Sequence, residues 1–443
     1  MTQMSLPRTV PFRTAWILLI ALACTNVLLI LHSAVDLPYW DEWEVLLPDA
    51  LPAGLTWDWL FARHNEHLVV TTKFLVWLLY KLNGWNLVSH VALNLLTWLA
   101  MVAWVIRLGI KQPGNMDSGI PAAFSVFIFS TIFHENLYWA FQSAFHLCLF
   151  FFFIAVELLF DEKQSSRRIL TGAAFAALSI FSMSFGPGSC AVLLLSWLFF
   201  KLVRFRAGRE NSTRFLCQAA AVTIVIGGSL AGWVISLPET NQSSIIWPDR
   251  LSFWNFFTNQ ISWGFGIGTT SFLLGLLCFL IVILPPAIRF SEIRAGRSLE
   301  IAEYKLFTAI FGLLAAAAIF ALGRSGGLLS ASKFSRYAEV TAFLVPLSAI
   351  AWATVLNRLP LLRKRVLVGI WGLCFFAYSD DWQFRTYSNH GRDLKNNESC
   401  VRDYYAGKGP AICPALYPTG SIADRLDAAR KLNLSFYRRL RSR

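Results

Sequence analysis

Two adjacent carboxylates, Asp41 and Glu42, form the pattern in this sequence that is most capable of chemistry. They belong to a segment, residues 36–67, in which six acidic residues precede the first basic one, Arg63. Neighbouring carboxylates repel each other, so holding both of them near a bilayer raises the pKa of at least one. A carboxylate with a raised pKa is suited to act as a general base. A solvated acidic loop is the other interpretation of this composition.

A histidine-containing run, His64-Asn65-Glu66-His67, follows these acids. Its nitrogen and carboxylate atoms, together with Asp41, are ligands that a divalent cation accepts. The run lacks the HExxH spacing of zinc hydrolases. We therefore expect His64, Glu66 and His67 to make hydrogen bonds within the loop or to a substrate. A divalent cation held by Asp41, His64 and His67 is the alternative.

Aromatic rings accompany the polar residues in two places. Indole rings beside acidic residues either anchor a loop at the membrane surface or stack on the faces of sugars. The turn FHENLYWAFQ, residues 133–142, adds polar groups between two apolar runs, and we expect these to contact a substrate; a plain aromatic-belt turn is the alternative. The tryptophans are Trp40, Trp43, Trp57 and Trp59, and the candidate residues of the turn are His134, Glu135, Tyr138 and Gln142.

A basic segment late in the chain complements the early acids. Arg324, Lys333 and Arg336 lie at the expected outer boundary of a membrane span, where the positive-inside rule makes basic residues scarce. Cations on that side favour an anionic ligand, and the planar fork of arginine suits a phosphate. We expect these three residues and the adjacent Tyr337 to contact a substrate. The alternative is that the basic side chains extend to lipid head groups.

The composition identifies the scaffold that must position these residues. Hydrophobic residues make up 56% of the 443 residues and charged residues 15%, with a mean hydropathy of +0.52. Apolar runs of about 17 to 22 residues recur along the chain, and each can cross a bilayer as a helix. This pattern excludes a water-soluble globule and an outer-membrane barrel, whose strands alternate with period two. The net charge of +13 lies in short clusters between these runs, which favours membrane orientation over nucleic-acid binding.

We predict an all-α, polytopic transmembrane bundle of about eleven spans with a cytoplasmic N-terminus. The segment 67–82 is short and carries Lys73, and a crossing there would turn every later basic connector outward. We therefore expect it to lie in the interface as an amphipathic helix. The predicted spans are 14–35, 86–106, 120–136, 142–160, 169–185, 187–203, 215–236, 261–288, 305–323, 338–356 and 366–379.

This topology divides the chain into a polytopic domain, residues 1–380, and a small extracytoplasmic tail, residues 381–443. The first outer loop spans residues 36–85. Of the eight cysteines, only Cys400 and Cys413 lie in a polar segment. In an oxidising compartment they can close a loop worth about 3 kcal/mol as a disulfide; two unrelated thiols are the alternative.

The layout resembles the GT-C superfamily of integral-membrane glycosyltransferases over residues 10–380. The shared features are the paired acid Asp41-Glu42 in the first outer loop, an interfacial helix behind it, and the late Arg-rich segment from Arg324 to Tyr337. His64-Asn65-Glu66-His67 stands where relatives carry a His-Pro-Pro-Leu-like element and departs from that form.

The resemblance implies transfer of a sugar from a polyprenyl-phosphate carrier to a glycan, lipid or protein acceptor of the cell envelope. The reaction would take place on the extracytoplasmic face of a bacterial inner membrane. Asp41 first, and Glu42 second, would take the proton from the acceptor hydroxyl. Arg324, Arg336 and Lys333 would hold the lipid phosphate and stabilise its charge as it leaves.

Two other classes of membrane protein use similar residues. A flippase or transporter of a lipid-linked or anionic substrate places its ionisable groups near the membrane midplane, commonly between repeated halves. The sequence shows no such halves. An O-antigen-type polymerase or ligase shares the lipid-phosphate cations but has its main catalytic loop late in the chain.

Overall fold

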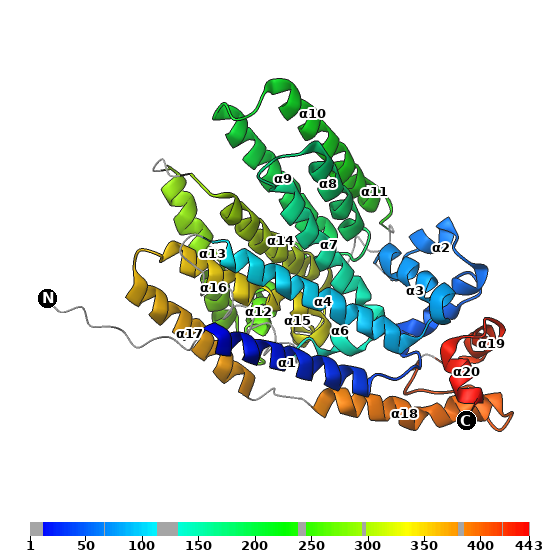
Figure 1. The fold of residues 1–443 in the computed structure, drawn as a ribbon. Coiled ribbons are helices and arrows are strands. Elements are labelled where there is room, and N and C mark those ends of the chain that lie inside the picture. Colours follow the sequence, from blue (N-terminus) through cyan, green and yellow to red (C-terminus); the bar gives the residue numbers. More distant parts are fainter. Residues whose placement is uncertain are drawn as a thin grey trace.

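The computed structural model describes residues 12–65, 67–112, 132–237, 245–294, 298–379, 385–418 and 420–442. Within these residues the chain forms helices and two isolated bridges but no β-strand (Figure 1). The predicted all-α fold is confirmed. Helices are the expected result, because a helix satisfies its own backbone hydrogen bonds in lipid, where water is absent.

Seven helices in the described part of the chain are long and apolar enough to cross a membrane. They give the chain the architecture of a multi-pass membrane protein. Three of them are composite. The seven are α4 (Leu87–Ile110), α7 (Ser143–Leu159) with the preceding turn η3 (Ala140–Gln142), α9 (Gly186–Arg206), α10 (Ser212–Val222) continuing through the π-helical turn η4 (Thr223–Gly227) into α11 (Gly228–Ile235), α13 (Phe272–Arg294), α14 (Ile301–Arg324), and α15 (Ser335–Ala342) continuing into α16 (Leu344–Val355).

Two predicted spans have a different form in the structure. At the predicted span 169–185, α8 (Ser166–Ile180) has 15 residues, fewer than the roughly 20 that a bilayer requires. The single predicted span 261–288 is wrong, because α12 (Leu251–Gly264) ends before α13 begins. Gly266, with a φ of 85°, turns the chain at that point, and its N–H donates to the carbonyl of Trp263.

The other predicted spans leave the total number open. Most of 120–136 lies outside the described residues. The predicted spans 14–35 and 366–379 correspond to α1 (Phe12–Ser33), with 22 residues, and α17 (Pro360–Ser379), with 20, and both stand outside the seven. The eleven-span topology therefore stays a prediction.

Helix α4 defines the two ends of the bundle. Where it begins, the N–H of Leu87 donates to the Asp36 carboxylate at 2.9 Å. Near its other end, Arg107 and Lys111 lie 3.5 and 3.8 Å from the carboxylate of Glu157. We call the first the site end and the second the basic end.

Short helices gather at the site end (Figure 1). Helix α3 corresponds to the expected interfacial segment 67–82, and its 14 residues extend about 21 Å, too short to cross a bilayer. The polar tail helices pack against the first loop. The elements at this end are η1 (Trp40–Leu46), η2 (Leu51–Ala53), α2 (Trp57–Phe61), α3 (Val70–Asn83), α6 (His134–Tyr138), η6 (Leu329–Lys333), α18 (Arg385–Tyr405), α19 (Ala423–Lys431) and α20 (Ser435–Arg441).

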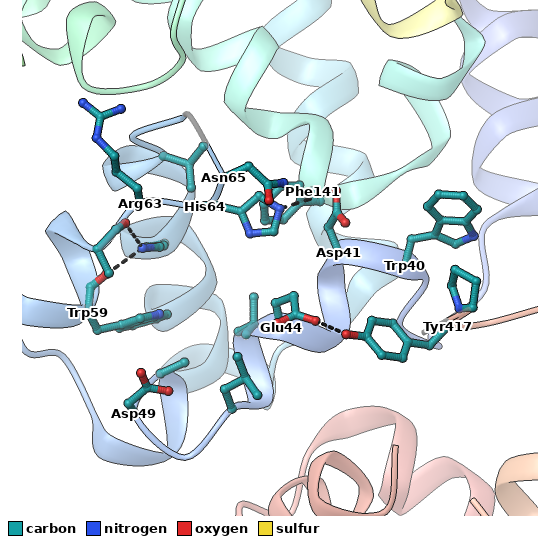
Figure 2. A pocket seen from close by; sticks show the side chains of 17 residues that line it. Trp40, Asp41, Glu44, Asp49, Trp59, Arg63, His64, Asn65, Phe141 and Tyr417 are labelled. Carbon is teal, nitrogen blue, oxygen red and sulfur yellow. Dashed lines mark hydrogen bonds and ion pairs between the residues drawn. The ribbon is translucent and has the colours of Figure 1, made fainter. Parts of the chain in front are cut away.

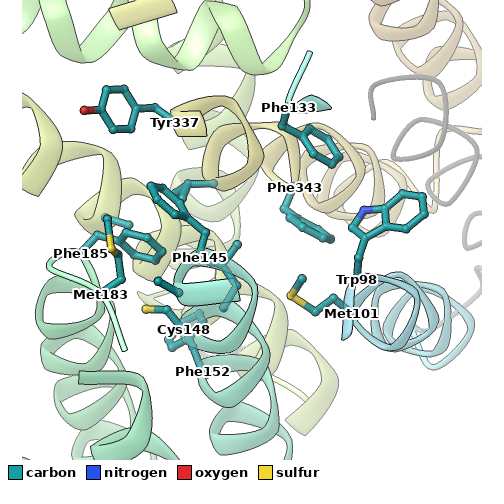
Figure 3. Packing of buried hydrophobic residues seen from close by; sticks show 14 of the residues in the cluster. Trp98, Met101, Phe133, Phe145, Cys148, Phe152, Met183, Phe185, Tyr337 and Phe343 are labelled. Carbon is teal, nitrogen blue, oxygen red and sulfur yellow. The ribbon is translucent and has the colours of Figure 1, made fainter. Parts of the chain in front are cut away.

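The core lies where α4, α7, α14 and α15 meet, and Figure 3 shows its large side chains. Helices in lipid associate through close packing, so small residues matter at their contacts. Gly312 of α14 is one example, because a Cβ at this position would lie 2.3 Å from the ring of Phe152. Tyr337 of α15 also belongs to this core, where its ring centroid lies 4.7 Å from that of Phe320.

Candidate functional site

A pocket of about 560 Å³ opens at the site end of the bundle (Figure 2). Its walls come from η1, the α2–α3 connection, α3, the turn before α7 and the tail, so the fold assembles it from segments far apart in the sequence. Among its lining residues are Trp40, Asp41, Glu44, Asp49, Trp59, Arg63, His64, Asn65, Lys73, Phe141 and Tyr417.

Asp41 is the predicted base that faces this pocket. Its carboxylate Oδ2 lies 3.5 Å from His64 Nε2, and its side chain is 37% exposed. The preceding residue, Trp40, has a φ of 50°, a left-handed conformation that costs energy for a bulky side chain. A hydrogen bond from the Trp40 N–H to the carbonyl of Leu416 in the tail holds this conformation. The backbone conformation of Trp40 therefore fixes the direction of the Asp41 side chain.

The predicted second base, Glu42, points away from the pocket. It is buried and accepts hydrogen bonds from the N–H groups of Tyr39 at 2.8 Å and Phe141 at 3.1 Å. Burial raises its pKa to about 8, although both hydrogen bonds oppose the shift. Glu42 joins η1 to the turn before α7, and its assignment as an alternative base is not supported by this geometry.

The histidine-containing run folds into a tight reversal. The backbone groups of His64 and His67 bond reciprocally at 2.9 Å, with Asn65 between them at a φ of 52°. Asn is among the residues that adopt this conformation most readily. His64 packs against the ring of Phe141 at 4.9 Å between centroids. Glu66 lies outside the described residues.

His67 links the early and late segments electrostatically. Burial lowers its pKa to about 3, and the nearby charges of His64, Arg336 and Arg63 lower it further, while Asp41 raises it. His67 is therefore neutral at physiological pH. The acidic first loop and the late basic segment lie at the same end of the bundle, where the turn at 133–142 hydrogen bonds both to η1 and to the first turn of α15.

The late basic residues have three different environments. Lys333 donates to the carbonyls of Asn259 and Ile267 and to the hydroxyl of Ser262, at 2.7 to 2.8 Å. An ammonium group has three N–H donors, so this lysine has none left for a phosphate, and this geometry does not support its predicted role in substrate binding. Burial lowers the pKa of Lys333 to about 7.

Arg336 is the late cation that stays available. Its guanidinium lies over the rings of Phe334 and Tyr337, and among the described residues it has no hydrogen-bond or ion-pair partner. The predicted contact Tyr337 faces the core instead of a pocket. Arg324 lies at the last turn of α14, and neither Arg324 nor Arg336 is among the residues that line the pocket.

The turn at 133–142 supports the pocket and does not line it except at Phe141. The hydroxyl of Ser335 lies 3.3 Å from His134 Nδ1 and accepts a hydrogen bond from the N–H of Glu135. Tyr138 stacks on His390 of α18 at 4.0 Å between centroids. Gln142 is buried. His134 and Glu135 therefore join α6 to α15, and Tyr138 joins α6 to the tail.

Three residues with a role at this end, His146, Glu339 and Asn136, were missed from the sequence. His146 Nδ1 lies 2.7 Å from Glu339, its Nε2 lies 2.7 Å from the carbonyl of Asn136, and all three side chains are buried. Asn136 also donates to Glu339 at 2.7 Å and to the carbonyl of Arg336 at 3.0 Å. This network fixes the first turn of α15, which carries Arg336, against α6 and α7.

Lys73 also lines the pocket. In the sequence analysis this residue serves only to argue that the segment 67–82 does not cross the membrane. Its ammonium donates to the carbonyls of Trp59 at 2.7 Å and Ala62 at 2.6 Å. One of its three N–H donors is left after these two bonds. Burial lowers the pKa of Lys73 to about 8, and Asp49 opposes the shift.

The tail completes one wall of the pocket. Tyr417 hydrogen bonds to Glu44 through its hydroxyl, and Arg425 lies 3.1 Å from the same carboxylate. Cys400 and Cys413 form the expected disulfide, with 5.9 Å between their Cα atoms. The bridge ties α18 to the segment that leads to Tyr417.

The described residues contain no group of three or more His, Cys, Asp or Glu side chains arranged to hold a metal ion. Asp41, His64 and His67 therefore do not form the alternative cation site in this geometry. Of the four tryptophans, Trp40 and Trp59 line the pocket, Trp57 is exposed, and Trp43 is buried against Phe436. Comparisons with models of protein families, with curated proteins and with solved structures find no match for this chain.

Proposed function

We propose that the protein is a membrane glycosyltransferase of the GT-C type, which transfers a sugar from a polyprenyl-phosphate carrier to an acceptor on the extracytoplasmic face. The observation that carries the proposal is the placement of Asp41 and Arg336 at the same end of the bundle. Asp41 lines the pocket, and the turn at 133–142, which adds Phe141 to the pocket wall, also hydrogen bonds to the backbone carbonyl of Arg336. Asp41 faces the pocket beside His64, and the charges of Asp41 and Arg336 both act on His67. A carboxylate and a guanidinium at one membrane boundary are the groups that such a transfer requires.

In the proposed reaction Asp41 takes the proton of an acceptor hydroxyl as its oxygen attacks the anomeric carbon. The bond from that carbon to the phosphate oxygen breaks, and the polyprenyl phosphate leaves with the bonding electrons. His64 orients the Asp41 carboxylate. Arg336 offsets the charge that develops on the phosphate. Lys73 lines the same pocket and keeps one N–H donor for a substrate oxygen.

A lipid-linked donor must reach the pocket from the bilayer. Trp57, Phe61 and Phe74 of α2 and α3 are exposed, with 76%, 44% and 47% of their surfaces accessible. Exposed large apolar residues on short helices are typical of an interfacial surface. The pocket borders this apolar surface through Trp59 and Ala62, which supports lateral entry of a carrier.

A flippase or transporter is less well supported. Such proteins hold their substrate near the midplane. In this chain the ionisable residues of the described pocket lie at one end of the bundle, beyond the first turns of α4 and α7. This placement favours chemistry at the membrane boundary.

The proposal is tested by assaying the purified protein with a panel of polyprenyl-phosphate sugars and acceptors. Asp41→Asn should abolish transfer, whereas Asp58→Asn should retain it, because Asp58 is an exposed acid of the same loop that does not line the pocket. Normal turnover by the Asp41 variant would remove the proposed base. Absence of turnover with every lipid donor, together with transport of one of them, would replace the enzyme by a flippase.

A further inference from the structure

A second cavity, of about 730 Å³, opens at the basic end of the bundle. It lies between the last turns of α4, α9 and α13 and the first turn of α14. Helix α4 has 24 residues and therefore separates this cavity from the first pocket by about 36 Å, roughly the thickness of a bilayer. The two cavities consequently open at opposite membrane boundaries.

Positive charge is in excess around this cavity. Four cations line it, Lys111, Arg204, Arg209 and Lys305, against two carboxylates, Glu162 and Glu300. A third carboxylate, Glu157, lies 3.0 Å from Lys305 and 3.8 Å from Lys111. It also has Arg107 as a neighbour at 3.5 Å. One negative charge cannot balance three positive ones, so the wall keeps a net positive charge.

Two of the cations, Lys305 and Arg204, are built into the wall instead of projecting into water. The side chain of Lys305 is 8% exposed. The Nε of Arg204 is buried and has no hydrogen-bond partner in the described part of the chain, while its guanidinium lies over the ring of Phe200. A buried donor without an acceptor is costly, so an acceptor from a ligand would stabilise this site.

The remaining wall is apolar and opens toward lipid. Phe199 and Val203 of α9 are 46% and 40% exposed, and Leu108 and Ile293 lie on the neighbouring helices. A ligand that satisfies both parts of the cavity has an anionic oxygen-rich group joined to hydrocarbon. Guanidinium groups bind phosphate oxygens with paired, charge-assisted hydrogen bonds.

We infer that this cavity binds the phosphate head group of an anionic phospholipid, with Arg204 and Arg209 as its principal cations and the exposed face of α9 against an acyl chain. The site lies at the end of the bundle that carries the basic connectors, where anionic lipid is attracted by juxtamembrane cations. It is independent of the pocket at the site end.

The test measures lipid binding to the purified, delipidated full-length protein by native mass spectrometry, with phosphatidylglycerol and phosphatidylcholine as probes. The wild type should bind phosphatidylglycerol more tightly. Arg204→Ala/Arg209→Ala should weaken phosphatidylglycerol binding about 30-fold and leave phosphatidylcholine binding unchanged. The matched control, Arg206→Ala/Arg358→Ala, removes two exposed cations that do not line the cavity and should change binding less than about twofold.

Three outcomes would overturn the inference. Equal binding of the two lipids would exclude recognition of charge, and equal loss in both double variants would indicate a diffuse surface field without a site. Displacement of phosphatidylglycerol by millimolar inorganic phosphate, with phosphate alone raising the thermal stability as much as the lipid does, would assign the cavity to a free anion. Arg209→Ala alone, at an exposed position, keeps the test valid if loss of Arg204 impairs folding.

Discussion

His64 Nε2 lies 3.5 Å from Asp41 Oδ2 on the wall of the pocket at the site end, although these residues belong to different turns of the first loop. The ring is held from its other side by Phe141. A carboxylate with one oxygen beside a fixed ring has a restricted orientation, which a general base requires.

The first prediction concerns this pair. His64→Ala should lower kcat by about 10- to 100-fold with little change in the KM of either substrate, because it frees the Asp41 carboxylate to rotate. Steady-state kinetics with the lipid donor check this. His32→Ala, which removes an exposed histidine of α1, should have normal kinetics. An unchanged kcat in the His64 variant would show that Asp41 needs no orienting partner.

The second prediction separates the two late cations. Arg336→Ala should raise the KM for the lipid donor about tenfold or more and affect the acceptor KM little, because the guanidinium is the available partner for a phosphate. Donor and acceptor titrations measure the two values. Equal increases for both substrates would count against a phosphate contact.

The Lys333→Ala variant serves as the comparison for the Arg336→Ala variant. It leaves three buried acceptors at the end of α12 without their donor, so it should lower the thermal stability of the protein before it changes the donor KM. A selective rise in donor KM, with normal stability, would restore Lys333 as a substrate ligand.

The third prediction follows from Glu42. Its pKa is raised by burial from 4.5 to about 8, so the folded state favours the protonated form. The stability from this group is fully present below pH 4.5 and is lost as the pH rises toward 8, because folding must then keep a charge buried or bind a proton. Glu42→Gln should flatten the fall of Tm over this interval. A variant with the same pH profile as the wild type would show that Glu42 is charged in the folded protein.

The fourth prediction concerns the disulfide. Cys400→Ser/Cys413→Ser should destabilise the tail by about 3 kcal/mol and should also lower the activity, because the bridged segment leads to Tyr417 on the pocket wall. Thermal unfolding and the transfer assay measure the two effects. Cys24→Ser, at an unbridged and exposed position, should change neither. Full activity of the double variant would separate the tail from the pocket.

The helical membrane bundle could be predicted from the sequence because it depends on hydropathy averaged over many residues. The length and hydropathy of the apolar runs predict a helical membrane bundle wherever they exceed the thickness of hydrocarbon. The run at 261–288 shows the limit of such averages. One glycine, Gly266, turns the chain between α12 and α13 and leaves the average hydropathy almost unchanged.

The candidate site depends on the directions in which its side chains point, and these directions cannot be read from the sequence. Asp41 and Glu42 are neighbours, but they lie in a 3-10 helix, where successive side chains point about 120° apart. Only one of them can therefore face a given pocket. The partnership of His146 with Glu339 is similarly hidden, because the two residues lie in separate helices, α7 and α15, and the sequence does not show which helices pack together.

Glu44 and Tyr417 meet across the pocket although 373 residues separate them. A ribosome must therefore complete nearly all of the membrane bundle, and the tail must pack against the first loop, before this wall exists. A chain released before residue 417 keeps Asp41 but has an open pocket. Catalytic competence, in the proposed enzyme, is then withheld from unfinished chains without the help of a separate inhibitor.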